Sequence, residues 1–240
     1  ARTFQVEDAA ILDPGYATFS GATVADSNIY IDVYFNEGVY GDENAQTGLS
    51  DNALIIGIIV PFNGTATAIS IDSLKNYTGA ELIGGEDTIR VFLNVTGTPN
   101  GLENIEIFAT SNSTVFDQSG TFTPATYSMS QAVGGRYLRD LTGPALELID
   151  ISGNTVAGMK YVAVNTPTLT ITAEDAKSIE VDALSLTCTV NGNPVLINPI
   201  VITSEVATVI EFVTEFVDTV FTFGDIIFTV TDTAGNSTTL

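Results

Sequence analysis

Ile29-Tyr30-Ile31-Asp32-Val33-Tyr34-Phe35 has an apolar residue at every second position, with a tyrosine or an aspartate between them. Successive side chains of an extended chain point to opposite sides, so the four apolar residues share one face. This alternation predicts a half-buried β-strand that packs its apolar face into a core.

Similar runs recur along the chain, with turn residues between them. The runs are Ile89–Val95, Ile105–Ile107, Leu169–Ile171 and Ile226–Thr231. The turn signals are Asn63-Gly64, Gly84-Gly85, Asn100-Gly101, Gly134-Gly135 and Asn191-Gly192. Short strands separated by turns predict an all-β fold, a sandwich or a barrel, without a long amphipathic helix.

The same alternation predicts the core residues. We expect one core built from Ile29, Ile31, Val33, Phe35, Val91 and Leu93, and a second built from Leu184, Leu186, Phe228 and Val230. Two segments have mixed patterns. Val206–Val220 fits both a helical face and a strand, and we interpret it as a strand because β-branched residues dominate it. A single helical turn fits Ile71–Tyr77.

A domain boundary is predicted near Gly143-Pro144, because this dipeptide interrupts regular structure. We place the first domain at residues 1–142 and the second at residues 143–240. Each length suits one β-sandwich.

The charge of the chain limits its partners. Its 240 residues include 29 Asp and Glu against 7 Lys and Arg, a formal net charge of −22. Such a field repels phosphate backbones and anionic lipid headgroups, so we expect no nucleic-acid partner. No apolar run approaches the roughly 20 residues of a membrane-spanning helix, so we also expect no membrane insertion.

Residues that often carry catalysis are scarce. The chain has no His and no Trp, and Cys188 is its one cysteine. The composition excludes histidine triads, histidine-ligated zinc and an intramolecular disulfide. Cys188 lies on the apolar face of Leu184–Val190, which predicts a buried, unreactive thiol. Paired carboxylates can serve a glycosidase, but the Trp that often stacks on sugars is absent. We therefore predict a protein without enzymatic activity.

Carboxylates group in predicted loops and at strand ends. The groups are Asp42-Glu43, Asp140 with Glu147 and Asp150, and Glu174-Asp175. Calcium binds about six to eight hard oxygen ligands, which loops supply from carboxylates and carbonyls. We predict a calcium site at Asp140, Glu147 and Asp150 that stiffens the domain junction by neutralising repulsion. The alternative is that these are ordinary solvated charges of surface loops.

One turn pattern occurs three times, with an Asp followed closely by a Gly. The three segments are Phe116–Thr121, Ile149–Asn154 and Asp232–Asn236. An Asp side chain forms Asx turns, and Gly adopts a positive φ without strain. We therefore expect the same turn conformation in all three places.

Longer stretches of the chain resemble known modules. Ala22–Tyr40 resembles the opening of prokaryotic immunoglobulin-like repeats in surface-layer and adhesive proteins, whose first strand often ends in Phe-Ser-Glu-x-Val-Tyr; here Asn36 replaces the Ser. Thr98–Ile107 and Val115–Gly120 resemble the close of the same module. The second half is similar to a second immunoglobulin-like type in Leu169–Asp175, Val190–Gly192 and Asp232–Asn236. The resemblance implies two tandem immunoglobulin-like β-sandwiches, an extracellular or cell-surface location and no catalytic residues.

Two functions fit these features. A surface protein without an anchor segment, a catalytic constellation or a basic patch is retained by contacts with other chains, or it belongs to a larger protein. We expect a self-assembling subunit of a surface layer, sheath or filament, whose partners are copies of itself. The alternative is an adhesin, or an accessory binding module of a larger secreted protein.

The segment Ala1–Leu12 is a candidate for the assembly contact. Phe4, Val6 and Ile11 make it apolar, and an extended terminal segment can add a strand to an open sheet edge of a neighbouring copy. The alternative is that the segment pairs within its own domain as an ordinary first strand.

Asn-x-Ser/Thr sequons mark candidate glycan sites of an extracellular protein. They begin at Asn63, Asn76, Asn94, Asn112 and Asn236. In a chain so rich in Ser and Thr, about three would arise by chance, so the excess is small.

Overall fold

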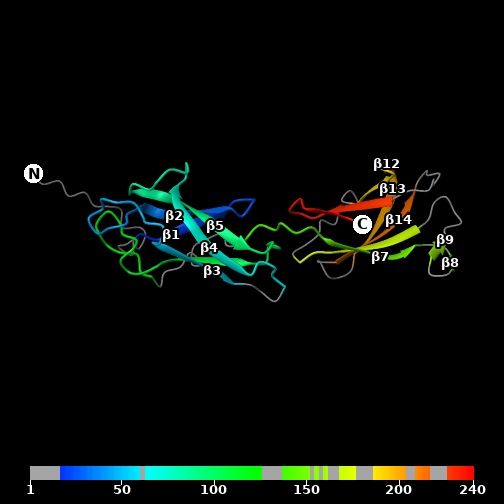
Figure 1. Cartoon of the computed structure of the whole chain (residues 1–240), viewed down its shortest axis with the longest axis horizontal. Coiled ribbons are helices and arrows are strands. Elements are labelled where there is room, and N and C mark those ends of the chain that lie inside the picture. The colour runs from blue at the N-terminus through cyan, green and yellow to red at the C-terminus, as the bar shows by residue number, and fades with distance from the viewer. Residues whose placement is uncertain are drawn as a thin grey trace, which may run out of the picture. The chain divides into compact units, whose positions relative to one another are not determined.

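The computed structural model describes residues 17–59, 63–125, 137–151, 154–156, 159–161, 168–176, 186–203, 209–216 and 226–240 (Figure 1). Within these ranges the chain is all-β, with no helix, and this confirms the predicted fold class. The described part therefore contains no helix that could cross a membrane.

The chain divides into two compact units. Unit 1 comprises Ala1–Thr98 and Glu103–Arg139, and unit 2 comprises Pro99–Leu102 and Asp140–Leu240. The change from one unit to the other at Arg139 and Asp140 falls three residues before the boundary expected from Gly143-Pro144.

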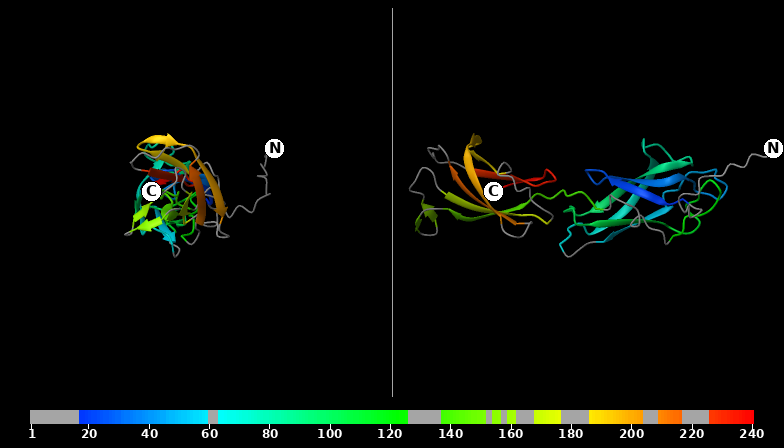
Figure 2. Two further views of the ribbon diagram at one scale, coloured as in Figure 1. Left: turned by 90° about the vertical axis from the view of Figure 1, so that its right-hand side faces the viewer. Right: turned by 180° about the vertical axis from the view of Figure 1, so that it is seen from behind.

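Unit 1 is built from two antiparallel sheets, whose strands Figure 2 shows from two further sides. The larger sheet has the order β1-β2-β5-β4, with β1 at Phe19–Val24, β2 at Tyr30–Val39, β5 at Glu86–Thr96 and β4 at Ala68–Asn76. The smaller sheet pairs β3 at Leu54–Ile59 with β6 at Asn104–Ala109. Both sheets turn apolar side chains toward one core, as alternation requires.

The core of unit 1 contains five of the six residues predicted for it. Ile31, Val33, Phe35, Val91 and Leu93 are buried. The prediction for Ile29 is wrong, because its side chain is 55% exposed. β2 begins only at Tyr30, and the preceding Asn28 has a φ of 58°, so the alternation does not extend back to Ile29.

The helical turn predicted at Ile71–Tyr77 is also wrong, because strand β4 covers Ala68–Asn76. Ile71 pairs with Leu93 and Leu74 pairs with Val91, so both face the core although they are three positions apart. The register shift between Ile71 and Ser73 inserts Asp72 as a bulge. The bulge produces a spacing that looks helical in the sequence.

Unit 2 has two four-stranded antiparallel sheets and a small hairpin. One sheet has the order β13-β14-β10-β7, formed by Ile197–Thr203, Val209–Phe216, Thr168–Glu174 and Ala145–Ile151. The other has the order β12-β11-β15-β16, formed by Asn193–Val195, Thr187–Val190, Ile226–Thr231 and Ser237–Thr239. The hairpin pairs β8 at Asn154–Val156 with β9 at Met159–Tyr161. Strand β14 confirms the strand interpretation for the described part of Val206–Val220.

The predicted core residues of unit 2 are buried where the structure describes them. Leu186, Phe228 and Val230 pack with Leu169, Ile171, Ala173 and Cys188. Leu184 lies outside the described residues. The two units are therefore sandwich-like, each with a core of its own.

Candidate metal centre

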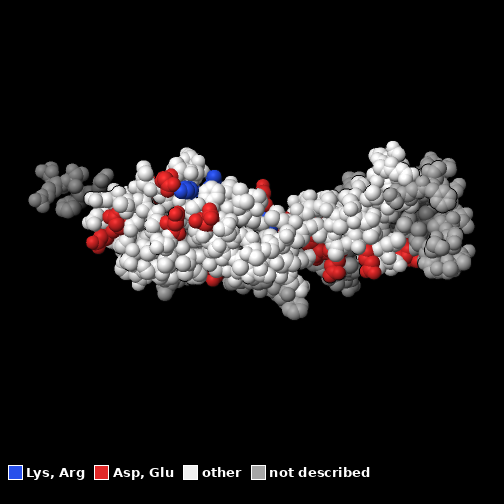
Figure 3. Space-filling model, in the orientation of Figure 1, with Lys and Arg blue, Asp and Glu red and all other residues white. Residues whose placement is uncertain are grey.

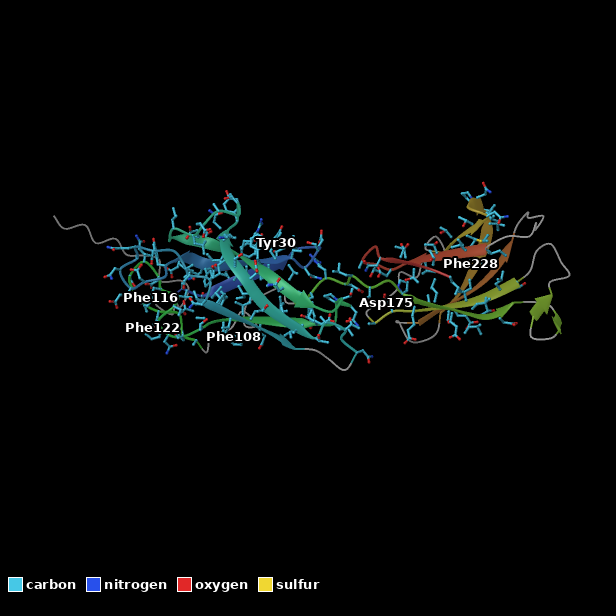
Figure 4. The ribbon with its side chains drawn as sticks, in the orientation of Figure 1. Tyr30, Phe108, Phe116, Phe122, Asp175 and Phe228 are labelled. Carbon is cyan, nitrogen blue, oxygen red and sulfur yellow. The ribbon has the colours of Figure 1, made fainter. Side chains whose placement is uncertain are left out.

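Three buried aspartates meet in unit 2. Asp140, Asp175 and Asp232 are 9%, 4% and 3% exposed, and one oxygen from each lies within 4.8 Å of the others. Asp175 is labelled in Figure 4, at one end of the strands of this unit. Ionised carboxylates in such proximity repel strongly in a low dielectric, and a positive charge between them would offset this repulsion.

Strand ends bring these aspartates together. Asp175 follows the last residue of β10, and Asp232 follows the last residue of β15. Asp140 precedes β7, which is the neighbour of β10 in its sheet. Since β10 and β15 belong to different sheets, the centre joins the two sheets at one end of the sandwich.

Local hydrogen bonds hold the carboxylates of Asp140 and Asp232. Oδ1 of Asp140 accepts hydrogen bonds from the backbone N–H of Thr142, at 2.9 Å, and from its hydroxyl, at 2.8 Å. Oδ1 of Asp232 accepts one from the backbone N–H of Asn236, at 2.9 Å. The side-chain nitrogen of Asn236 donates to Oδ2 of Asp232, at 2.9 Å, and to the carbonyl oxygen of Asp140, at 3.2 Å. Asn236 therefore ties Asp140 and Asp232 together.

The donor set suits a hard divalent cation. All three candidate ligands are carboxylates, which calcium and magnesium prefer over softer ligands. Calcium–oxygen distances are about 2.3–2.6 Å, so two ligands on opposite sides of one calcium ion lie about 4.6–5.2 Å apart. The three oxygens lie within 4.8 Å of one another, close enough for one such ion to contact all of them. From Asp140 to Leu240 the sequence has no basic residue other than Lys160 and Lys177.

The centre differs from the calcium site predicted at Asp140, Glu147 and Asp150. Asp140 belongs to it, but Glu147 and Asp150 are exposed on β7 and are not members. An extended strand advances about 3.3 Å per residue, so β7 carries these two residues away from its beginning. The structure thus groups Asp140 with Asp175 and Asp232, and a calcium site at Asp140, Glu147 and Asp150 stays a prediction.

The sequence carried signals for the two members of the cluster that the prediction did not include, Asp175 and Asp232. Asp175 was noted only as part of the pair Glu174-Asp175, and Asp232 only as a turn residue. Each directly follows an alternating run, Leu169–Ala173 and Ile226–Val230. The sequence does not show that these two strands end on the same side of the sandwich.

The predicted Asx turn is confirmed where the structure describes it. The backbone N–H of Asp117 donates to the carbonyl oxygen of Thr121, and the backbone N–H of Thr121 donates to Oδ1 of Asp117. Asp232 and Asn236 form the same two hydrogen bonds. Gly120 and Gly235 have φ values of 83° and 91°. The turn after Asp150 includes residues outside the described ranges.

A further copy of this turn occurs at Asn76-Tyr77-Thr78-Gly79-Ala80. Oδ1 of Asn76 accepts a hydrogen bond from the backbone N–H of Ala80, at 2.9 Å, and Gly79 has a φ of 87°. Asn can replace Asp in an Asx turn because it keeps the acceptor oxygen. The same spacing of Asx and Gly was therefore present in the sequence.

Asp42 belongs to another of the carboxylate groups noted in the sequence, and its side chain organises its own loop. It accepts hydrogen bonds from the backbone N–H groups of Asn44, Gln46 and Thr47 and from the hydroxyl of Thr47. The hydroxyl of Thr47 makes the largest contribution to lowering the pKa of Asp42. These donors fix the loop from Asp42 to Thr47 around the carboxylate.

Tyr30 of β2 packs against side chains of the neighbouring strand β5. The guanidinium of Arg90 lies 3.9 Å from the centroid of the Tyr30 ring, and Phe92 meets the ring edge-on. Tyr30 is labelled in Figure 4. Arg90 also donates two hydrogen bonds of 2.8 Å to Asp32, and this carboxylate raises its pKa. Figure 3 shows basic side chains beside acidic ones on unit 1.

Cys188 is buried, as predicted, and pairs with Phe228 across β11 and β15. Burial raises the pKa of its thiol to about 11. The thiolate is the reactive form of cysteine, so this side chain is a poor nucleophile at neutral pH.

Comparisons of the chain with models of protein families, with curated proteins and with solved structures found no match. The centre in unit 2 therefore has to be interpreted from its own geometry.

Proposed function

We propose that the chain is a non-enzymatic, extracellular structural protein made of two immunoglobulin-like modules, the second of which is stabilised by a divalent cation. The observation that carries the proposal is the group of three buried aspartates at the strand ends of unit 2. In this reading Asp140, Asp175 and Asp232 bind calcium, and water or backbone oxygens complete its coordination.

The cation offsets the repulsion among the three carboxylates and attracts all of them at the end of the two sheets. Binding to the folded state alone stabilises it by RT ln(1 + [L]/Kd), about 2.7 kcal/mol at a calcium concentration 100 times Kd. In the unfolded chain the three aspartates are not held close together, so it does not compete for the ion. Calcium thus takes part in holding together a sandwich that lacks a disulfide.

The test compares thermal unfolding in calcium and in chelator at fixed ionic strength. The midpoint of unit 2 should rise by several degrees in calcium. Asp232→Asn should abolish this difference, because the amide loses the charge and one hard ligand. An equal rise in the variant, or no rise in the unaltered chain, would contradict the proposed site.

Asp117→Asn is the matched control. Asp117 occupies the same position in the same kind of turn, but it lies in unit 1, outside the cluster. Its substitution is expected to leave the calcium-dependent rise of unit 2 unchanged.

In this proposal the chain acts as a structural subunit by assembling with copies of itself through open sheet edges. Strands β1 and β4 end the larger sheet of unit 1, and β7 ends a sheet of unit 2. On β7, Leu148 and Ile149 are 43% and 53% exposed. Unpaired edge strands and exposed apolar residues favour strand addition by another chain.

Ala1–Leu12 lies outside the described residues, so its role through Phe4, Val6 and Ile11 stays a prediction. Deleting residues 1–12 and examining the folded product by electron microscopy tests it. Soluble monomers are expected, whereas normal polymers would rule out linkage by this segment. A native protein that is itself monomeric would favour the alternative, an adhesin or binding module.

A further inference from the structure

The sequons of this chain differ in how their Asn side chains use their two polar atoms. N-glycosylation joins C1 of a sugar to Nδ2, and the donor is a phosphate-activated glycosyl lipid. The C1–O bond of the donor breaks, its phosphate leaves, and Nδ2 loses one proton. Oδ1 remains an acceptor, so hydrogen bonds to Oδ1 survive the reaction. Nδ2 keeps only one N–H, so hydrogen bonds from Nδ2 hold the nitrogen that must react, and two of them cannot both survive.

Asn76 and Asn112 are held through Oδ1. Oδ1 of Asn76 accepts hydrogen bonds from the backbone N–H and hydroxyl of Thr78, at 2.9 and 2.7 Å, and from the backbone N–H of Ala80, at 2.9 Å. Oδ1 of Asn112 accepts one from the backbone N–H of Ala125, at 2.7 Å. Within the described residues, Nδ2 of neither side chain donates a hydrogen bond.

The surroundings of these two residues also favour access. Asn112 is exposed, in a loop that follows β6. Asn76 is the last residue of β4 and opens a tight turn whose tip, Tyr77, is 66% exposed. A sugar on either Nδ2 leaves the hydrogen bonds of its loop intact.

Asn236 and Asn94 use Nδ2 instead. Nδ2 of Asn236 donates to Asp232 and to the carbonyl oxygen of Asp140, so a sugar there would break the tie between these residues. Nδ2 of Asn94 donates to Oδ1 of Asp72, at 3.3 Å. The backbone of Asn94 is also fixed within β5, in register with Ser70 of β4.

We propose that the folded chain accepts N-linked glycans at Asn76 and Asn112 and excludes them from Asn94 and Asn236. Both proposed sites, Asn76 and Asn112, lie in unit 1. The amide of Asn236 is engaged instead in hydrogen bonds to Asp232 and Asp140. The inference extends the extracellular assignment, but it depends on neither calcium binding nor self-assembly.

The test uses the folded full chain, a purified single-subunit oligosaccharyltransferase and a lipid-linked oligosaccharide, with occupancy mapped by mass spectrometry. Short peptides that span each sequon, measured with the same enzyme, give the intrinsic rate of each acceptor. Relative to its peptide, Asn236 should be slower than Asn112 by at least about tenfold, because two hydrogen bonds must break first. Relative to their peptides, Asn76 should react about as fast as Asn112, and Asn94 should be slowed in the same way as Asn236.

Circular dichroism before and after the reaction checks that the chain stays folded. Transfer to Asn236 at the rate of its peptide would overturn the inference, as would failure of Asn76 and Asn112 when their peptides are good acceptors. Because the assay needs no calcium, its outcome is separate from that of the proposed cation centre.

Discussion

At the scale of the residue, two aspartates in equivalent turns have different roles, which depend on the residue four positions later. Asp117 and Asp232 both accept a hydrogen bond from the backbone N–H of that residue. After Asp117 this residue is Thr121, whereas after Asp232 it is Asn236, whose amide reaches a second aspartate. One side-chain amide thus connects a local turn to the candidate metal centre.

Asp42 leads to a prediction about pH. Its pKa is lower in the folded state, so its contribution to stability is complete above the ordinary Asp pKa of about 4 and is lost as the pH falls through the lowered value. Asp42→Asn should therefore reduce the loss of stability of unit 1 in acid. Urea denaturation between neutral pH and about pH 3 measures this, and identical acid dependence in both chains would contradict it.

Cys188 leads to a prediction about reactivity. Because burial raises its pKa to about 11, the folded chain should react very slowly with a thiol reagent at pH 8, and the unfolded chain should react at the rate of a free cysteine. A chromogenic disulfide reagent, with and without denaturant, makes the comparison. Rapid labelling of the folded chain would place the thiol at the surface.

At the scale of the element, alternation predicted strands well and irregular positions poorly. The run from Ile31 to Phe35 is buried at every second residue because β2 is regular there. The alternation around Ile71 was misread because one inserted residue, Asp72, changes the spacing of core positions from two to three. A bulge is set by pairing with the neighbouring strand, so the segment alone does not reveal it.

The candidate metal centre also could not be predicted in full from local sequence patterns. Each aspartate is visible in the sequence as the residue beside a strand, and Asp140 was predicted. Asp175 and Asp232 join it only because β10 and β15 end on the same side of two different sheets. Topology of this kind depends on long-range pairing, which local residue patterns do not encode.

Two glycines of unit 1 test the turn conformation. Gly79 and Gly120 both have positive φ, of 87° and 83°, in the same kind of turn. A Cβ added at Gly79 meets nothing within 4 Å, whereas one added at Gly120 would clash with the carbonyl oxygen of Glu43. Gly79→Ala should lower the free energy of unfolding by about 1–2 kcal/mol, the cost of a left-handed backbone, and Gly120→Ala should lower it further. Urea denaturation of both variants checks this order, and equal effects would contradict the turn geometry.

At the scale of the whole molecule, the chain combines a net charge of −22 with two separate β cores. Unit 1 forms ion pairs such as Arg90 with Asp32, but the sequence of unit 2 offers few basic residues to its carboxylates. In the proposed function, a cation bound by Asp140, Asp175 and Asp232 would supply the missing positive charge in unit 2. The two units should therefore respond differently to calcium.

Isothermal titration calorimetry of calcium into the chelator-treated full chain tests this account most directly. We predict one saturable site per chain, and its loss in Asp175→Asn. Asp42→Asn should keep the site, because Asp42 lies in unit 1 and is not a member of the cluster. No saturable binding in the unaltered chain, or the same site in Asp175→Asn, would contradict the account.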